Sequence, residues 1–142
     1  MINGQALLNG GAGVVGGFIG FAYGGWSEAL TFLLIAFAVD IVSGIVASRK
    51  EGVGLSSSIA RAGFAGKGMA MLVLLLSHRI DVLLELDAVI LTAATYFYIA
   101  NELLSIVENY GRAGYPLPDK VKDVIDVLKR KGDVSGAKPK GE

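Results

Sequence analysis

Acidic side chains stand inside two stretches of the chain that are otherwise almost entirely apolar. Asp40 lies within residues 29–48, and Glu102 and Glu108 lie in the second half of residues 88–109. A carboxylate at the centre of a membrane costs about 2.5–3.5 kcal/mol on insertion scales, so it is expected to face other protein or water, or to be protonated. These acids therefore predict either hydrogen-bonded contacts between helices or a water-lined path.

Residues 88–109 carry a regular polar face in addition to their acids. Polar side chains recur there at 3-4-3-4-3 spacing, which places them along one side of a helix. Such a face on an apolar helix indicates either a buried seam between helices or a surface that lines water, and the sequence leaves both open. The face, which neighbours Glu108, comprises Thr95, Tyr98, Glu102, Ser105, Asn109 and Arg112.

Small residues are spaced for close helix packing in the first two apolar segments. Gly16, Gly20 and Gly24 form a tandem GxxxG pattern in the first segment, which removes side chains from one helix face and lets another helix approach. We expect this segment to pack against a copy of itself or a neighbouring helix; the alternative is a flexible, partly inserted segment. A second stripe, at four-residue spacing, consists of Ala36, Asp40, Gly44 and Ser48.

Positive charge is concentrated in two places. The first 48 residues contain no Lys or Arg, whereas the stretch from Gly111 onward holds eight basic and five acidic residues. Residues 49–67 are expected to be a basic loop on anionic headgroups, with Ser56–Ser58 as candidate helix caps. Because basic loops stay on the cytoplasmic side, four spans place both termini in the cytoplasm. The membrane-surface basic residues are Arg49, Lys50, Arg61 and Lys67.

The third apolar segment, predicted over residues 64–84, has charged residues near both ends. Lys67 and Asp81 are 14 residues apart, about 21 Å of helix, which is less than the hydrocarbon thickness of about 30 Å. The span would need Lys67 and Arg79 to extend toward the headgroups, or a locally thinner bilayer. His78 is expected at the interface rather than on a metal, because the sequence has no second histidine.

The composition places the whole chain among all-α integral membrane proteins. Of its 142 residues, 53% are hydrophobic and 18% charged, and the mean hydropathy is +0.57. We expect no enzyme, metal or cofactor, because the chain has no Cys, one His and no Ser beside a base. A transmembrane domain is predicted over residues 1–110, with four spans, or three if the first segment lies in the interface. The predicted elements are spans at 6–26, 29–48, 64–84 and 88–109, a Gly/Pro turn and amphipathic helix at 111–132, and a disordered tail at 133–142.

The end of the fourth segment resembles the toxin-secretion and phage-lysis holin family. Members typically carry an N-E-hydrophobic-S-I-x-E-N run at the end of a transmembrane helix, then a glycine and a P-x-P turn; here the run is NELLSIVENYGRAGYPLP. Asp40 and Gly44 are similar to the family's D-x-x-x-G helix, and Ser57, Arg61 and Lys67 to its S-x-x-x-R/G-x-x-G-x-x-K loop. In the terminal run the matching positions are Asn101, Glu102, Ser105, Ile106, Glu108, Asn109, Gly114, Pro116 and Pro118.

The resemblance implies a phage-encoded homo-oligomer of the bacterial inner membrane whose partners are lipids and an endolysin, with no nucleic acid. Such proteins accumulate and then assemble abruptly into lesions through which the endolysin, or in some systems a toxin, crosses. On this hypothesis Asp40 and Glu102 lie at similar depth and stay protonated or paired, with Lys67 as one candidate partner, until assembly exposes them to water. The alternatives are an antiholin or other regulatory membrane subunit, and a small ion channel or transporter.

Overall fold

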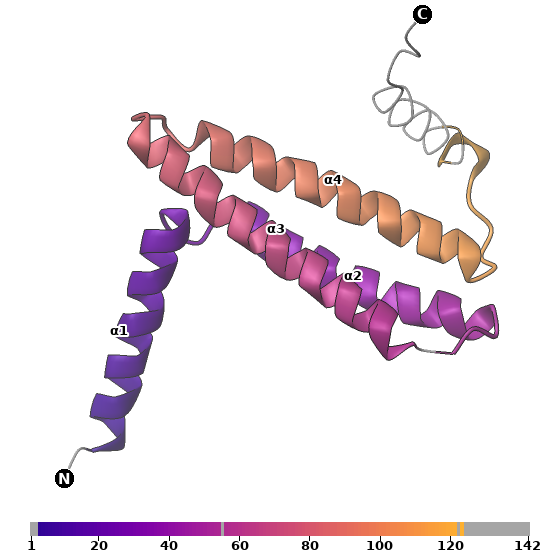
Figure 1. Ribbon diagram of the computed structural model, residues 1–142, viewed down its shortest axis with the longest axis horizontal. Helices are drawn as coiled ribbons and strands as arrows, with labels where there is room; N and C mark the ends of the chain where they lie inside the picture. The colour runs from indigo at the N-terminus through magenta and orange to yellow at the C-terminus, as the bar shows by residue number, and fades with distance from the viewer. Residues whose placement is uncertain (1–2, 55, 122, 124–142) are drawn as a thin grey trace, which may run out of the picture.

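The described part of the chain folds into four long helices. A computed structural model describes residues 3–54, 56–121 and 123. The long helices in this part are α1 (Gly4–Tyr23), α2 (Glu28–Lys50), α3 (Ser57–Leu83) and α4 (Val89–Arg112) (Figure 1). Each helix contains a stretch long and apolar enough to cross a membrane. At about 1.5 Å per residue the shortest, α1, still reaches about 30 Å. The all-α membrane architecture predicted from the sequence is therefore confirmed.

Short polar residues fix the start of the first two helices. The side chain of Asn3 accepts a hydrogen bond from the backbone N–H three residues on at 2.9 Å, and Ser27 does the same at 3.2 Å. Such caps satisfy donors that the first helical turn leaves without partners. At the other end of α2, Arg49 and Lys50 occupy the last turn, where positive charge is favourable to the helix dipole.

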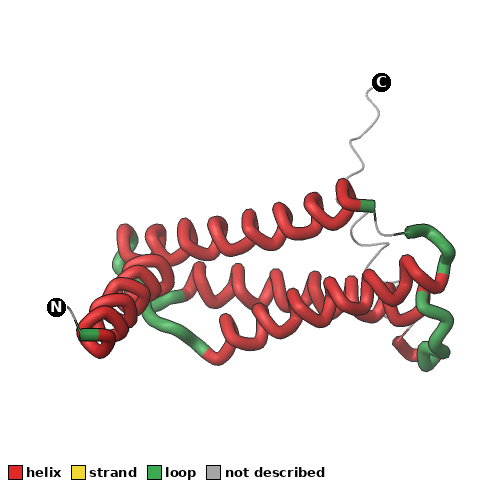
Figure 2. Tube along the Cα trace, turned by 90° about the horizontal axis from the view of Figure 1, so that it is seen from below, coloured by secondary structure: helices red, strands yellow, loops and turns green. Residues whose placement is uncertain are grey.

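Three of the helices form a bundle, and the first points away from it. In Figure 1, α2, α3 and α4 run side by side, whereas α1 departs from the end of the bundle at which α2 begins; Figure 2 shows the same three helices alongside one another. Helix α4 packs most extensively on α2 and next on α3. Helix α1 packs mainly on α3, and less extensively than either of these pairs. The fold thus positions α2, α3 and α4 around a shared interior.

The apolar core fills one half of this interior. Its buried side chains come from the first half of α2, the second half of α3 and the first half of α4. These three parts lie at the end of the bundle near α1, because α2 and α4 run antiparallel to α3 (Figure 1). The other half of the interior is therefore left to the polar residues described below. The core consists of Leu30, Leu33, Phe37, Ala70, Leu74, Leu91 and Ile99.

An aspartate from α3 closes the connection to α4. Asp81 is 1% exposed, and its two carboxylate oxygens accept the backbone N–H groups of Ile90 and Leu91 at 2.9 and 2.8 Å. The residue at the helix boundary, Ala88, has a left-handed φ of 53° and offers no side-chain cap. Asp81 therefore supplies the N-terminal cap of α4 from the neighbouring helix. These two hydrogen bonds stabilise the α3–α4 hairpin.

The corner between α1 and α2 holds α1 against the end of α3. Gly24 has a φ of +69°, and a Cβ placed on it would lie 2.7 Å from Cε1 of His78, so only glycine fits there without strain. The Arg79 guanidinium lies 4.7 Å from the Phe21 ring centroid, and the Tyr23 hydroxyl donates to a backbone oxygen of α3 at 3.4 Å. Arg79 therefore packs on α1 instead of extending freely toward the headgroups.

The structure corrects the expected extent of the basic loop. Helix α3 begins at Ser57, with Ser56 at the N-cap position, so residues 57–67 are helical and the loop is limited to the short connection after α2. Lys67 does not end the helix, because side chains from two other helices neutralise its charge. With 27 residues, α3 is not too short to span. Within the amphipathic helix predicted in the region 111–132, residues 119–121 and 123 are helical. Residues 122 and 124–132 of that region and the predicted tail at 133–142 lie outside the described residues.

Candidate functional site

Lys67 joins the three helices of the bundle through charged side chains. Its Nζ lies 2.9 Å from Oδ2 of Asp40 on α2 and also pairs directly with Oε2 of Glu102 on α4. The side chains of Lys67, Asp40 and Glu102 are 12%, 17% and 14% exposed, so little of the cluster reaches the surface. The ammonium also lies 4.8 Å from the Phe37 ring centroid, a cation–π distance. We call Asp40, Lys67 and Glu102 the charged triad.

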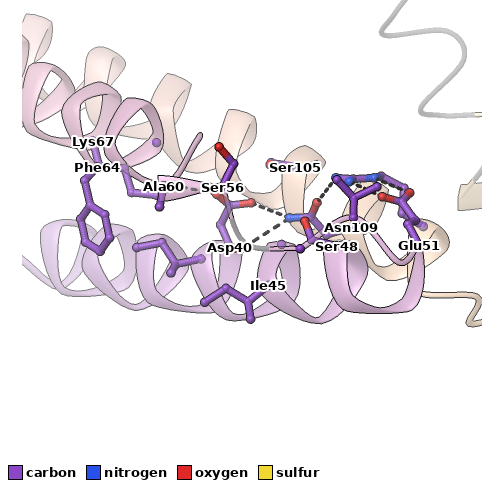
Figure 3. Close-up of a pocket in the computed structure, with 16 residues that line it drawn as sticks. Asp40, Ile45, Ser48, Glu51, Ser56, Ala60, Phe64, Lys67, Ser105 and Asn109 are labelled. Carbon is purple, nitrogen blue, oxygen red and sulfur yellow. Dashed lines mark hydrogen bonds and ion pairs between the residues drawn. The ribbon is translucent and has the colours of Figure 1, made fainter. Parts of the chain in front are cut away.

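Asn109 extends the triad toward the end of the bundle. This residue of α4 is 7% exposed, and its amide donates to Oδ1 of Asp40 at 3.0 Å and to the Ser43 hydroxyl at 3.1 Å. A Cβ on Gly44 would lie 3.4 Å from the Asn109 amide nitrogen. Gly44 thus leaves room for the amide to reach α2, and Asp40 accepts hydrogen bonds from both α3 and α4 (Figure 3).

The network ends in an ion pair near the surface. The side-chain oxygen Oδ1 of Asn109 accepts a hydrogen bond from the Arg112 guanidinium at 3.1 Å. Arg112 in turn donates twice to the Glu51 carboxylate, at 3.0 and 2.7 Å. These two side chains are 48% and 35% exposed. The hydrogen bond from Arg112 is the main cause that lowers the pKa of the Glu51 carboxyl from its ordinary value.

An open cavity of about 340 Å³ lies beside this network. It is bounded by the second half of α2, the α2–α3 connection, the first half of α3 and the last turns of α4, as Figure 3 shows. Its walls mix small residues, a few apolar side chains and the polar groups of the network. The lining residues that come from the triad and its extension are Asp40, Glu51, Lys67, Asn109 and Arg112, with Gly44, Ser48, Ser56, Ala60, Gly63 and Ser105 among the small ones.

The polar face of α4 lies against α2 and α3. Thr95 is 2% exposed and donates to a backbone oxygen of its own helix at 2.7 Å. Tyr98 packs against the apolar core, Ser105 lines the cavity, and Glu108 is half-buried. The polar seam inside the bundle of a single chain consists of Thr95, Tyr98, Glu102, Ser105 and Asn109.

The small residues predicted to mediate packing fall into two groups. Ala36, which is 4% exposed, and Gly44 pack inside the bundle, and Gly24 meets His78 at the corner. A Cβ on Gly16 or Gly20 would meet nothing within 4 Å. The glycine face of α1 is therefore open in the single chain.

The basic residues predicted at the membrane surface also fall into two groups, one exposed and one in the interior of the bundle. Arg49, Lys50 and Arg61 are exposed at the end of the bundle that holds the cavity. Lys67 is not a membrane-surface residue in this structure, because it lies between two carboxylates in the interior. Its partners Asp40 and Glu102 lie 27 positions earlier and 35 positions later in the sequence. Its grouping with the other basic residues was therefore wrong.

Sequence reasoning missed two participants. Glu51 and Asp81 both accept hydrogen bonds in the polar contacts described above. Nothing local marks either residue: the partner of Glu51 is 61 positions away, and Asp81 caps the following helix across a turn, at residues 9 and 10 positions later. Ser43, which accepts a hydrogen bond from Asn109, lies beside the small and polar stripe predicted around Asp40.

The arrangement is suited to holding helices together inside a membrane rather than to catalysis. The charges of the triad are paired, and every buried side-chain nitrogen and oxygen of the described residues has a hydrogen-bond partner. In the described part of the chain, no group of three or more His, Cys, Asp or Glu side chains is placed to hold a metal ion. The carboxylates and the ammonium would also be stable if water replaced their protein partners.

Comparison with known proteins gives consistent relatives. A sequence profile described as the bacteriophage holin family matches residues 17–130. An uncharacterised protein of Halalkalibacterium halodurans is 38% identical over 136 residues, which cover 92% of this chain and 98% of the relative. An uncharacterised 14.9 kDa protein in the nagH 3′ region of Clostridium perfringens is 34% identical, over 77% and 83% of the two chains.

A phage relative connects the family to this chain directly. A protein of Bacillus phage phi105 described as a probable holin is 33% identical over 104 residues, which cover 73% of this chain and 76% of the relative. No solved structure matches the chain. The profile covers well over half of the sequence, and its match includes the whole charged triad and the polar face of α4. The chain therefore belongs to the bacteriophage holin family, whose members are multi-pass membrane proteins that form pores and are not enzymes.

Proposed function

We propose that the protein is a holin that oligomerises in the bacterial inner membrane and opens lesions through which an endolysin reaches the cell wall, or a toxin leaves the cell. The observation that carries this proposal is the charged triad with its polar extension, enclosed between three apolar helices. Each of these charges is costly in lipid, and apolar helices without them would be enough to anchor a protein to a membrane. The same groups suit a protein that changes from a lipid-embedded to a hydrated state, because they pair with one another in the first state and can bind water in the second.

In the closed single chain, the triad keeps its charges away from lipid. If all three groups are ionised, two carboxylates face one ammonium, and the cluster has a formal charge of −1. A low-dielectric interior disfavours such an excess charge, so contact with water would favour a state in which the helices separate. A membrane potential acts on that charge at about 2.3 kcal/mol per elementary charge per 100 mV. The potential could therefore bias the transition.

The proposal includes an orientation. Residues 1–110 form the transmembrane domain, and the short connection after α2 and the region from residue 111 onward face the cytoplasm. Arg49, Lys50 and Arg61 are exposed at the same end of the bundle as the end of α4, and a cluster of positive charge favours the cytoplasmic side. Four spans then place both termini in the cytoplasm, on the same side of the membrane as the endolysin.

Inducible expression in a bacterial host, with and without a muralytic enzyme that lacks a secretion signal, tests the proposal. Expected are an abrupt loss of respiration and lysis only when the enzyme is present. Slow leakage of ions without lysis would instead indicate an ion channel, and delayed lysis on co-expression with a working holin would indicate an antiholin. Either result would refute the proposed function.

Two conservative variants test the role of the acids. Asp40→Asn and Glu102→Gln keep the size of each side chain but remove its charge. At equal protein levels each is expected to change the time of lysis, with the exposed lipid-facing variant Leu72→Ala as a control that leaves it unchanged. If the timing of both acid variants equals that of the wild type, the acids take no part in opening.

A further inference from the structure

One face of α1 combines amides with glycines. Gln5, Asn9, Gly13, Gly16 and Gly20 recur at 4-4-3-4 spacing, which sets them along a single side of the helix. We call these residues the amide–glycine face. The amide side chains are exposed and make no hydrogen bond to any other described residue, and a Cβ on each of the three glycines would meet nothing within 4 Å.

This face is unusual for a helix that only contacts lipid. Hydrocarbon offers an amide no hydrogen bond, so Asn and Gln in membrane helices usually bond to another helix, and glycines at this spacing allow its close approach. Helix α1 carries no charged residue. A partner for it should therefore offer polar but electrically paired groups and little side-chain bulk.

The cavity between α2 and α3 has these properties. Gly44 and Ser48 on one wall and Ala60 and Gly63 on the other leave it open, and its charges are already paired within the network. The hydroxyl of Ser48 provides both a donor and an acceptor. A volume of about 340 Å³ is at the lower end of the range for ligand sites. It is enough for the side chains of one helix face, with the helix itself lying over the opening.

When all four helices span the membrane, the amide–glycine face and the cavity also lie at similar depths in it. Because α1 leads directly into α2, the start of a spanning α1 lies at the same membrane surface as the end of α2. Asn9 is five residues from the start of α1, about 7.5 Å, and Gly44 is six residues from the end of α2, about 9 Å. The amides of α1 therefore reach the level of the cavity.

The α1 helix of the same chain is held elsewhere. Its last turn is fixed to the far end of α3 through Phe21 with Arg79, Tyr23 with a backbone oxygen, and Gly24 with His78. From there α1 points away from the bundle (Figure 1). Reaching its own cavity would break all three contacts, so a helix that fills the cavity is expected to come from another copy.

We propose that α1 of one copy docks through its amide–glycine face into the α2–α3 cavity of a second copy. This inference rests on the proposed oligomerisation and names the surfaces that carry it. Each copy then offers one helix and one cavity, so the interface is of the head-to-tail type, which builds rings or open chains without a fixed number of subunits. The triad of each subunit lies next to the docked helix of its neighbour.

Cysteine cross-linking tests the docking, since the natural chain has no Cys. Two copies with different tags are co-expressed, one with Asn9→Cys and the other with Ser48→Cys, and membranes are oxidised. A disulfide needs Cα atoms about 4.4–6.8 Å apart, so a mixed dimer is expected at about tenfold the yield of mismatched pairs. The matched controls are Leu7→Cys, on the opposite side of α1 at similar depth, and Val46→Cys, which is outside the cavity lining.

Two further variants make the outcome decisive. Gly16→Leu in the Asn9→Cys copy fills the amide–glycine face at a position where a Cβ would meet nothing within 4 Å, so it is expected to abolish the mixed dimer. A single chain with both cysteines distinguishes docking between copies from docking within one. A bond formed only within the chain, equal yields with Leu7→Cys, or a dimer that survives Gly16→Leu would each overturn the inference.

The lysis assay separates this inference from the proposed function. If the wild-type protein releases the muralytic enzyme but the mixed dimer is absent, the docking is wrong and the holin function stands. If the dimer forms and no lysis follows, the docking stands and the proposed function fails.

Discussion

Removal of the ammonium from the charged triad should destabilise the bundle more than removal of either carboxylate. Lys67→Met keeps an apolar stem but leaves Asp40 and Glu102 without the cation that they share. Breaking a buried ion pair from one side costs about 3–5 kcal/mol, whereas exposed pairs contribute about 0–1 kcal/mol. Side-chain exposures of 12–17% make the triad half-buried, between these two cases and nearer to the buried one. We therefore expect a loss at the lower end of the range for buried pairs, about 3 kcal/mol.

The two carboxylate variants should cost much less. Asp40→Asn and Glu102→Gln each leave Lys67 with one carboxylate, so the cluster becomes a one-to-one pair with no excess charge. The amide oxygen at position 40 can still accept the hydrogen bond from Asn109. The expected loss is about 1 kcal/mol, the net value of one hydrogen bond. The difference of about 2 kcal/mol corresponds to roughly thirtyfold in the unfolding equilibrium.

Thermal unfolding in matched detergent micelles, followed by circular dichroism, measures this order. For a chain of this size about 3 kcal/mol corresponds to a Tm lower by roughly 6–12 °C, on the scale of soluble domains. Leu72→Ala, at a side chain that is 58% exposed, controls for a general effect of substitution in α3. A Tm for Lys67→Met equal to or above that of Glu102→Gln would refute the assignment of Lys67 as the central cation.

Three other contacts make separate predictions. Asp81→Asn loses one of the two acceptors that cap α4, so a loss of about 1–2 kcal/mol and faster amide exchange at the start of α4 are expected. Arg112 lowers the pKa of Glu51, so this pair stabilises the fold above the ordinary Glu pKa and less as the pH falls below it; the Tm difference between wild type and Glu51→Gln should shrink on acidification toward about pH 3. Gly24→Ala strains a φ of +69° and clashes with His78, which should expose the α1–α2 connection to protease, and adding His78→Ala should restore protection only in part.

The sequence predicted the features that depend on local spacing. Helical periodicity alone placed Thr95, Glu102 and Asn109 on one face, and the structure turns that face toward α2 and α3. Four apolar segments were also predictable, because length and hydropathy decide whether a helix can span a membrane. The choice between a seam and a water-lined surface depends on neighbouring helices, which periodicity does not describe.

The features that depend on distant partners were predicted only in part. Lys67 was named as one candidate partner of Asp40 and Glu102, which the structure shows it to be. It also looked like the end of a loop, because an isolated cation is rarely tolerated in an apolar helix. In the structure it continues α3, since Asp40 and Glu102 arrive from helices on both sides. Asp81 likewise looked like a link residue, although it caps a helix that begins eight residues later. In both cases the charge is explained by tertiary contacts rather than by local sequence.

The same reasoning separates folding from function in one further variant. In lipid, apolar contacts give helices little preference for one another over the surrounding chains, so the polar network contributes specificity as well as stability. A buried charge cluster replaced as a whole by apolar side chains of similar size often leaves a fold as stable or more stable. The variant Asp40→Leu/Lys67→Met/Glu102→Leu should therefore keep a Tm at or above that of the wild type, with Asn109 still bonded to Ser43 and Arg112. It should nevertheless fail to release the muralytic enzyme, because the helices would have no charges to place in water; lysis at the normal time would show that the triad serves the closed fold alone.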